Sequence, residues 1–259
     1  MNWRSARKVA AGLCGLALVL TATLGAQTPA PDRMRISPAL GFEYFNRTIT
    51  WDNEAYTSKF KPMLFTLDLE VEVIKHFFVN LTGGYSLSNF DGLVFRQLPF
   101  SLDYEAGNLG GMLLGGGLRA NFVVGGDFEM DLGAQFVTYL GSTETWVLSG
   151  LNTDGTASGK ATWYRIQGGP VFWYKGFMYF SPYIRIGVDT LWGKFHMTET
   201  ISTLTGVEDK DIKSKALFVI AVGTLYEPAS NLGLKAEIFV LPHSKGLDYG
   251  AQAKIILSF

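Results

Sequence analysis

The last stretch of the chain, LDYGAQAKIILSF (residues 247–259), decides the fold class because its apolar residues recur at every second position. The residues on one side of an extended strand would be Leu247, Tyr249, Ala251, Ala253, Ile255, Leu257 and Phe259. Successive side chains of a strand point to opposite faces, so this period of two predicts an amphipathic β-strand that ends on an aromatic residue. Such a strand requires a second apolar layer to cover its apolar face.

The same alternation recurs along the chain. It is clearest in PMLFTLDLEVEVI (62–74), where the apolar face is opposed by Asp68, Glu70 and Glu72. Strands are predicted at 36–45, 62–74, 77–87, 112–122, 128–140, 162–172, 179–192, 216–226, 232–241 and 247–259. No long stretch has the apolar spacing of an amphipathic helix, and after Ala26 no apolar run is long enough for a membrane-spanning helix. The fold class is therefore predicted to be all-β.

The first 26 residues are typical of a secretory signal peptide. Arg4, Arg7 and Lys8 precede an uncharged stretch that runs to Ala26, and this order of a basic and then an apolar region marks such a signal. We predict cleavage after Ala26, with an uncleaved anchor as the alternative. Cleavage would leave 19 basic and 23 acidic residues, a net charge of −4.

Composition excludes several partners and cofactors. The mature chain would be slightly acidic, which gives no reason to expect nucleic acid as a partner, because those surfaces are usually basic. Cys14, the single cysteine, lies in the predicted signal peptide, so neither a disulfide nor a thiolate metal site is expected. We expect no metal and no cofactor.

Three features favour lipid, rather than a second sheet, as the layer that covers the apolar faces. The predicted strands are about ten residues long, which matches a tilted strand across a bilayer. Connections alternate between short turns, at Lys75, 123–127, 173–176 and 227–231, and long ones, at 46–59, 89–107, 141–159 and 195–213. Aromatic residues near predicted strand ends, as in a membrane girdle, are Trp51, Trp146, Trp163, Trp173, Trp192, Tyr174 and Tyr226.

These features predict a closed antiparallel up-and-down transmembrane β-barrel of about ten strands, because closure satisfies every backbone hydrogen bond within lipid. Eight strands remain if the first or the eighth predicted strand fails, and twelve if 93–104 pairs as a hairpin. The predicted division is a signal peptide at 1–26, a short periplasmic segment at 27–34 and a barrel domain at 35–259. An even strand number places both termini at the short-turn, periplasmic side.

The C-terminal strand resembles that of the outer-membrane barrel families of Gram-negative-type bacteria, which commonly end in Phe after alternating aromatic or aliphatic residues. The matching residues are Tyr249, Ile255, Leu257 and Phe259. The resemblance implies location in the bacterial outer membrane, contact with its lipid and lipopolysaccharide, and reading of this strand by the barrel assembly machinery. A monomer is expected.

The polar strand faces are predicted to line the lumen. Their charged residues are Glu43, Asp68, Glu70, Glu72, Arg119, Glu129, Asp131, Arg165, Arg185, Asp189, Lys235, Glu237 and Lys254. In a barrel this narrow the interior is nearly filled by side chains, so one interpretation is a plugged barrel held by ion pairs. The other is a narrow pore or ligand well, in which the acids of 68–72 would favour cations.

Catalysis is the alternative from a different class. Some barrels of this size are proteases or lipid hydrolases, but histidine is scarce, and His243 and Ser244 are adjacent on a strand and point to opposite faces. We predict that His196 and His243 are solvated loop residues and that the protein is not an enzyme.

The external loops are the remaining candidates for recognition. Residues 91–107 are unusually apolar, which predicts either a strand extension above the membrane or, as an alternative, a constriction or adhesive surface. The sequence as a whole predicts a structural or small-solute barrel with surface loops; a barrel enzyme and a loop-mediated adhesin are the alternatives.

Overall fold

The computed structural model describes residues 35–52, 57–95, 102–147, 155–244 and 246–259. The predicted signal peptide and the segment at 27–34 lie outside the described residues, so their boundaries stay predictions. Within the described ranges, no helix has the length and apolar character that crossing a membrane requires. Residues Arg35–Phe259 form one unit.

This unit is built from β-strands. They are β1 (Ile36–Trp51), β2 (Thr57–Ile74), β3 (Phe77–Phe95), β4 (Leu102–Gly125), β5 (Phe128–Gly141), β6 (Glu144–Val147), β7 (Gly155–Tyr174), β8 (Phe180–Ile201), β9 (Leu204–Ser214), β10 (Phe218–Ala229), β11 (Leu232–His243) and β12 (Gly246–Leu257). All twelve belong to one sheet, in which every pair in register is antiparallel.

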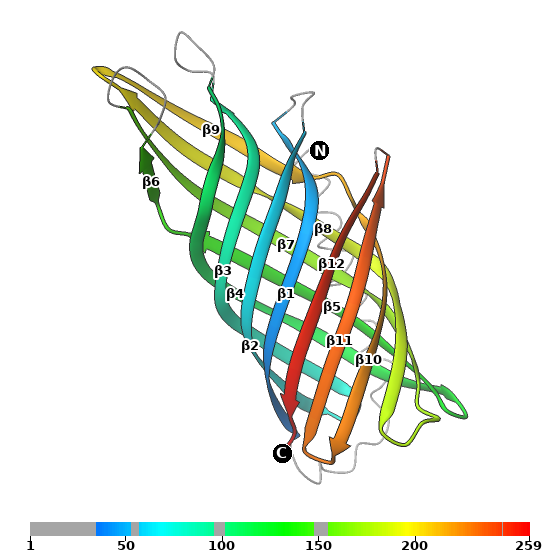
Figure 1. Ribbon diagram of the computed structural model, residues 1–259. Helices are drawn as coiled ribbons and strands as arrows, with labels where there is room; N and C mark the ends of the chain where they lie inside the picture. Colours follow the sequence, from blue (N-terminus) through cyan, green and yellow to red (C-terminus); the bar gives the residue numbers. More distant parts are fainter. Residues whose placement is uncertain (1–34, 53–56, 96–101, 148–154, 245) are drawn as a thin grey trace. The chain divides into compact units, whose positions relative to one another are not determined.

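The sheet closes into a barrel because β12 pairs with β1, from Ala39 opposite Ile256 to Asn46 opposite Tyr249. Ten of the described strands form this ring, in the order β1, β2, β3, β4, β5, β7, β8, β10, β11, β12 (Figure 1). Each coincides with one of the ten segments where the sequence alternates. The predicted closed antiparallel barrel is confirmed.

The two further strands extend the wall beyond the ring at one end. β9 pairs with the far end of β8, from Trp192 opposite Lys213 to Ile201 opposite Leu204, and the short β6 pairs with β7. At the same end, Leu93 lies opposite Tyr104. That pairing lengthens β3 and β4 instead of adding a hairpin to the ring, as the strand-extension interpretation of 91–107 predicts.

The long connections of the sequence are therefore shorter than predicted, because strands occupy much of each. The prediction of strands of about ten residues is wrong for six ring strands: β1, β2, β3, β4, β7 and β8 have 16, 18, 19, 24, 20 and 22 residues. The physical reason is that above the membrane neither wall face meets lipid, and the apolar outer face that identifies a strand is lost. Pairing continues there without that signal.

The opposite end holds the tight turns and the ends of the described chain. His76 and Gly126 adopt left-handed φ angles of 67° and 57° in two of these turns. Ile36 and Phe259 exchange backbone hydrogen bonds of 3.4 and 3.1 Å, so both ends meet at this rim. By the topology rule for such barrels, the tight-turn rim is the periplasmic one.

The outward faces of the ring are apolar, as the alternation predicts. Leu67 is 59% exposed whereas its neighbour Asp68 is 5% exposed, and the same contrast recurs around the ring. The residues of the C-terminal motif also face outward: Tyr249, Ile255, Leu257 and Phe259. In water this band would be a large apolar surface; in a bilayer it is the lipid-facing belt.

The prediction of an aromatic girdle is wrong for four of its members. Trp146 packs against the apolar core. Trp51, Trp163 and Trp173 are buried inside the barrel, whereas Trp192 and Tyr226 face outward. The reason is strand parity: Trp163 and Trp173 share the face of Arg165 on β7, which is the inner face. Proximity to a strand end was the wrong criterion, because it ignores which side of the strand a residue occupies.

The interior is divided along the barrel axis. Polar side chains line its tight-turn end, and apolar and aromatic side chains fill the other end. Buried charges separate the two. The zone at the tight-turn end is therefore polar, and the zone at the other end is apolar.

Candidate functional site

A chamber of about 610 Å³ lies inside the tight-turn end of the barrel. Its lining includes Lys75 and Ser230 in the tight turns and Ser258 near the chain end, so it reaches the rim assigned to the periplasm. Its inner wall comes from alternate residues of the ring strands, which explains why polar residues at every second position converge there. Ion pairs cross the chamber between strands that are distant in sequence.

The acid row of β2 is partnered. The Lys254 ammonium lies 2.7 Å from Asp68, and Thr82 donates to the same carboxylate at 2.6 Å. Glu70 receives a two-pronged hydrogen bond from Arg119 at 2.6 and 3.1 Å. Glu72 accepts from the backbone amide of His76. The row is therefore poorly suited to select mobile cations, since two of its three acids already carry a cationic partner.

Other predicted lumen charges also pair here. Arg119 reaches Asp131 at 3.3 Å, in addition to Glu70. Arg185 pairs with Glu237 at 2.6 Å, and the Tyr183 hydroxyl donates to that carboxylate at 2.9 Å. The structure thus brings these side chains together across the wall.

Among the described residues, three predicted lumen charges form no ion pair: Glu72, Glu129 and Lys235. Glu129 accepts a hydrogen bond from Asn121 at 3.3 Å. The Lys235 ammonium lies 4.8 Å from the ring centre of Tyr183 and 5.6 Å from that of Trp173. Glu129 and Lys235 both line the chamber.

A buried charge network separates this chamber from the apolar zone. Asp189 is fully buried and accepts from Arg165 Nε at 2.9 Å and Nη2 at 2.7 Å. Arg47 pairs with the same carboxylate, and Arg165 also reaches Glu43 at 2.7 Å. Two arginines and two acids from β1, β7 and β8 therefore neutralise one another across the lumen. Only a void of about 30 Å³ adjoins this network on the chamber side.

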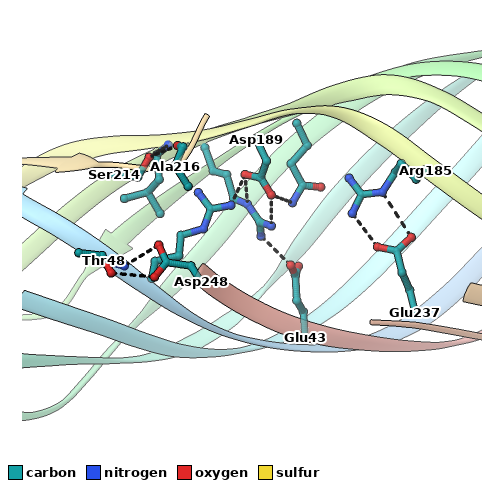
Figure 2. Close-up of polar contacts among 12 residues, drawn as sticks. Glu43, Thr48, Arg185, Asp189, Ser214, Ala216, Glu237 and Asp248 are labelled. Carbon is teal, nitrogen blue, oxygen red and sulfur yellow. Dashed lines mark hydrogen bonds and ion pairs between the residues drawn. The ribbon is translucent and has the colours of Figure 1, made fainter. Parts of the chain in front are cut away.

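The network is one of several polar contacts along the barrel. Figure 2 shows them spaced along the inside of the wall, in the order Thr48 with Asp248, then Asp189, then Glu43, then Arg185 with Glu237. Arg47 was not among the predicted lumen residues. The alternation of side chains along a strand could have identified Arg47 as a lumen residue, because Arg47 lies on the same face of β1 as Glu43.

Aromatic packing fills the barrel beyond the network. Phe60 stacks on Phe90 with ring centres 4.5 Å apart, and Trp163 stacks on Tyr139 at 5.2 Å. Phe195 meets Phe90 edge to face at 5.3 Å. All five side chains have zero exposure. This aromatic core, together with the charge network beneath it, closes the described lumen.

A polar cluster at the outer end of β12 corrects the prediction for His243. His243 ends β11 and is buried, with its Nε2 3.4 Å from the carboxylate of Asp248. Asp248 accepts from the Thr48 amide at 2.8 Å and hydroxyl at 2.7 Å, and Lys59 reaches it at 3.2 Å. The cluster joins β1, β2, β11 and β12 at the barrel seam, where the sheet closes. Neither the small number of histidines nor the predicted loop position of His243 indicates this role.

His196 differs from this pattern. It lies in β8, not in a loop, and pairs with Asp209 of β9 at 2.6 Å on the exposed outer surface. The prediction that it is solvated agrees with its exposure; its predicted loop position is wrong. The described part of the chain contains no group of three His, Cys, Asp or Glu residues placed to hold a metal ion.

Glu199 is an unpartnered acid in the wall extension. The outward residues of β8 from Phe180 to Trp192 are apolar apart from Thr190, then change to Lys194 and His196, so Glu199 lies beyond the lipid belt. Its side chain is fully buried, and neither carboxylate oxygen has a hydrogen-bond partner. Burial, and next the charge of Glu208, raise the pKa of this carboxyl.

Replacement of Glu199 by glutamine is therefore expected to change how stability depends on pH. A raised native pKa leaves the protein most stable where Glu199 is protonated in both states, and stability is lost as pH rises through that native pKa. The variant should gain stability over wild type progressively as pH rises above the pKa of a free glutamate, about 4.3. Urea unfolding in detergent micelles would measure the difference. Glu144→Gln, at an exposed site, is the control and should show no such trend; a parallel trend would contradict the assignment.

Comparison with known proteins identifies the class. No protein-family model and no curated protein matches the sequence. Among solved structures, the outer-membrane protease OmpT of Escherichia coli is similar over 91% of this chain and 99% of its own, with a TM-score of 0.54 and 9% identity. The translocator domain of the autotransporter NalP of Neisseria meningitidis gives a TM-score of 0.47 at 11% identity, over 98% and 97% of the two chains. The toluene transporter TodX of Pseudomonas putida gives 0.41 at 10% identity, over 86% and 67%.

The chain thus has the fold of bacterial outer-membrane β-barrel proteins, as the C-terminal strand predicts. At 9% identity the likeness to OmpT extends to the fold alone. Function must be argued from the interior and the rims of this barrel.

Proposed function

We propose that this protein is a closed, non-enzymatic outer-membrane barrel with a structural role, whose lumen does not conduct ions in its resting state. The observation that carries the proposal is the fully buried network of Arg47, Arg165 and Asp189 beneath a fully buried aromatic core. Ions entering the chamber would meet neutralised charges and then an apolar layer, from which they are excluded by desolvation. A structural role suits a lumen that buried side chains fill beyond the chamber.

Single-channel recording in a planar bilayer tests this proposal. The refolded mature protein should insert and give no discrete conductance steps, while a porin of known conductance inserted under the same conditions should give them. Insertion is checked separately by co-sedimentation with vesicles. Regular steps from the wild-type protein would overturn the closed-barrel proposal and return attention to the small-solute interpretation.

Hydrolysis is not proposed, and the seam cluster supports a structural reading. The Asp248 carboxylate is occupied by Thr48, Lys59 and His243. A nucleophile needs an adjacent base with room for substrate. Detectable peptide or lipid hydrolysis that His243→Ala abolishes would contradict a non-enzymatic role.

Lipopolysaccharide is the proposed lipid partner at the outer rim. Tyr164 and Trp192 stack on the outer surface with ring centres 5.9 Å apart, and the exposed Lys160 and Lys194 lie on the same strands just above them. Aromatic side chains at the interface with cations above them suit anionic headgroups. Recognition of the last strand by the assembly machinery and a monomeric state stay predictions.

A further inference from the structure

The chamber is electrically balanced as a whole, yet its charges are unevenly paired. Its basic residues are Arg35, Lys75, Arg119, Lys175, Arg185, Lys235 and Lys254, and its acidic residues are Asp68, Glu70, Glu72, Glu129, Asp131, Glu227 and Glu237. Ion pairs neutralise Arg119, Arg185 and Lys254. What distinguishes the chamber is therefore where its unpaired charges lie.

Two unpaired ammonium groups converge on one buried tryptophan. Lys175, in the turn after β7, places its Nζ 4.9 Å from the ring centre of Trp173, and Lys235 of β11 places its Nζ 5.6 Å from the same centre. The Trp173 indole is fixed because its N–H donates to Asp131 at 2.9 Å. Both ammonium groups therefore add positive charge to the wall of the chamber around this ring.

The neighbouring carboxylates neutralise this positive charge only in part. Glu237 is engaged by Arg185 at 2.6 Å and by the Tyr183 hydroxyl. Glu129 lies opposite Trp173 in the β5–β7 register but accepts from Asn121, and it forms no ion pair with either lysine in the described structure. The site thus presents positive charge to a chamber that is large enough for a small solute.

We propose that Lys175 and Lys235 form a binding site for a small anionic solute, with a carboxylate or phosphate group, that enters from the periplasmic rim. Lysine ammonium groups bind such anions as point charges with several donors each. Both lysines lie over the ring of Trp173, and the charge network ends the chamber on the far side. This inference goes beyond a structural role, because it gives the closed barrel a ligand.

Calorimetric titration of the full mature barrel in detergent, at constant ionic strength, tests the site. Inorganic phosphate and succinate serve as separate probes. Saturable binding of either is expected, and Lys175→Met and Lys235→Met should each weaken it by at least about tenfold, the effect of losing a charge-assisted contact. Lys213→Met makes the same change on the outer surface, where the side chain is 42% exposed, and should bind as wild type does.

Three outcomes would overturn the proposal: no saturable binding of either probe, equal weakening in all three variants, or unchanged binding in both chamber variants. Lys235→Gln, which keeps a polar side chain, repeats the test if the methionine variant does not fold. Folding is confirmed by the heat-dependent shift in gel migration that a closed barrel gives. Conductance is recorded separately, so a leaky barrel and an absent anion site give different results.

Discussion

Replacement of Asp189 by asparagine should destabilise the barrel by about 3–5 kcal/mol, the usual effect of removing one partner of a buried ion pair. Asp189 has zero exposure and is the shared partner of Arg47 and Arg165. Asparagine keeps the shape of the side chain but leaves two buried guanidinium groups with Glu43 as their acidic neighbour. The free energy of unfolding, measured by urea titration in detergent micelles, reports the loss.

Asp209→Asn provides the matched control, since it makes the same chemical change at a carboxylate that is 68% exposed. Its pairing with His196 lies on the surface, where such pairs contribute about 0–1 kcal/mol. Equal losses for the two variants would show that Asp189 does not hold the network. A double variant that also replaces Arg47 with methionine should recover part of the loss, because it removes one uncompensated charge.

The ring of this barrel could be predicted from the sequence because lipid imposes a strict rule on it. Wherever a strand crosses the bilayer, its outer side chains must be apolar, and the inner ones at Asp68 or Asp131 are free to be polar. That contrast is local and repeats every second residue. It therefore located all ten ring strands without knowledge of their partners.

The wall beyond the membrane lacked this signal. β9 carries Glu208, Asp209 and Asp211 in a segment that looks like a solvated loop, because water faces its outer side. What holds it as a strand is pairing with β8 and β1, which is a tertiary property. Local alternation cannot report a strand whose partners decide its structure.

The closed interior was also only partly predictable. Parity places Trp163 with Arg165 on the inner face of β7, so the inward tryptophan could have been found from the sequence. The meeting of Arg47, Arg165 and Asp189 could not, since it depends on the tilt and register of three strands. Register sets which inward side chains share a level, and one sequence does not specify it.

Trp163→Ala should lower the free energy of unfolding by about 3–5 kcal/mol, the range for removing a large buried aromatic side chain. Trp163 stacks on Tyr139 at 5.2 Å and meets Phe60 edge to face at 5.8 Å, and it has zero exposure. Alanine would leave a cavity that neighbouring strands cannot collapse to fill, because backbone hydrogen bonds fix the barrel radius. Urea unfolding measures the change.

Trp192→Ala is the control on the outer surface, where 36% exposure and lipid contact make the expected loss smaller. The same Trp163→Ala protein should remain silent in the planar bilayer, because the network of Arg47, Arg165 and Asp189 still closes the lumen beneath the new cavity. The two layers then act as seals in series, and loss of one does not open the barrel. Conductance steps from Trp163→Ala alone would show instead that the aromatic core is the sole seal and that the charge network passes ions.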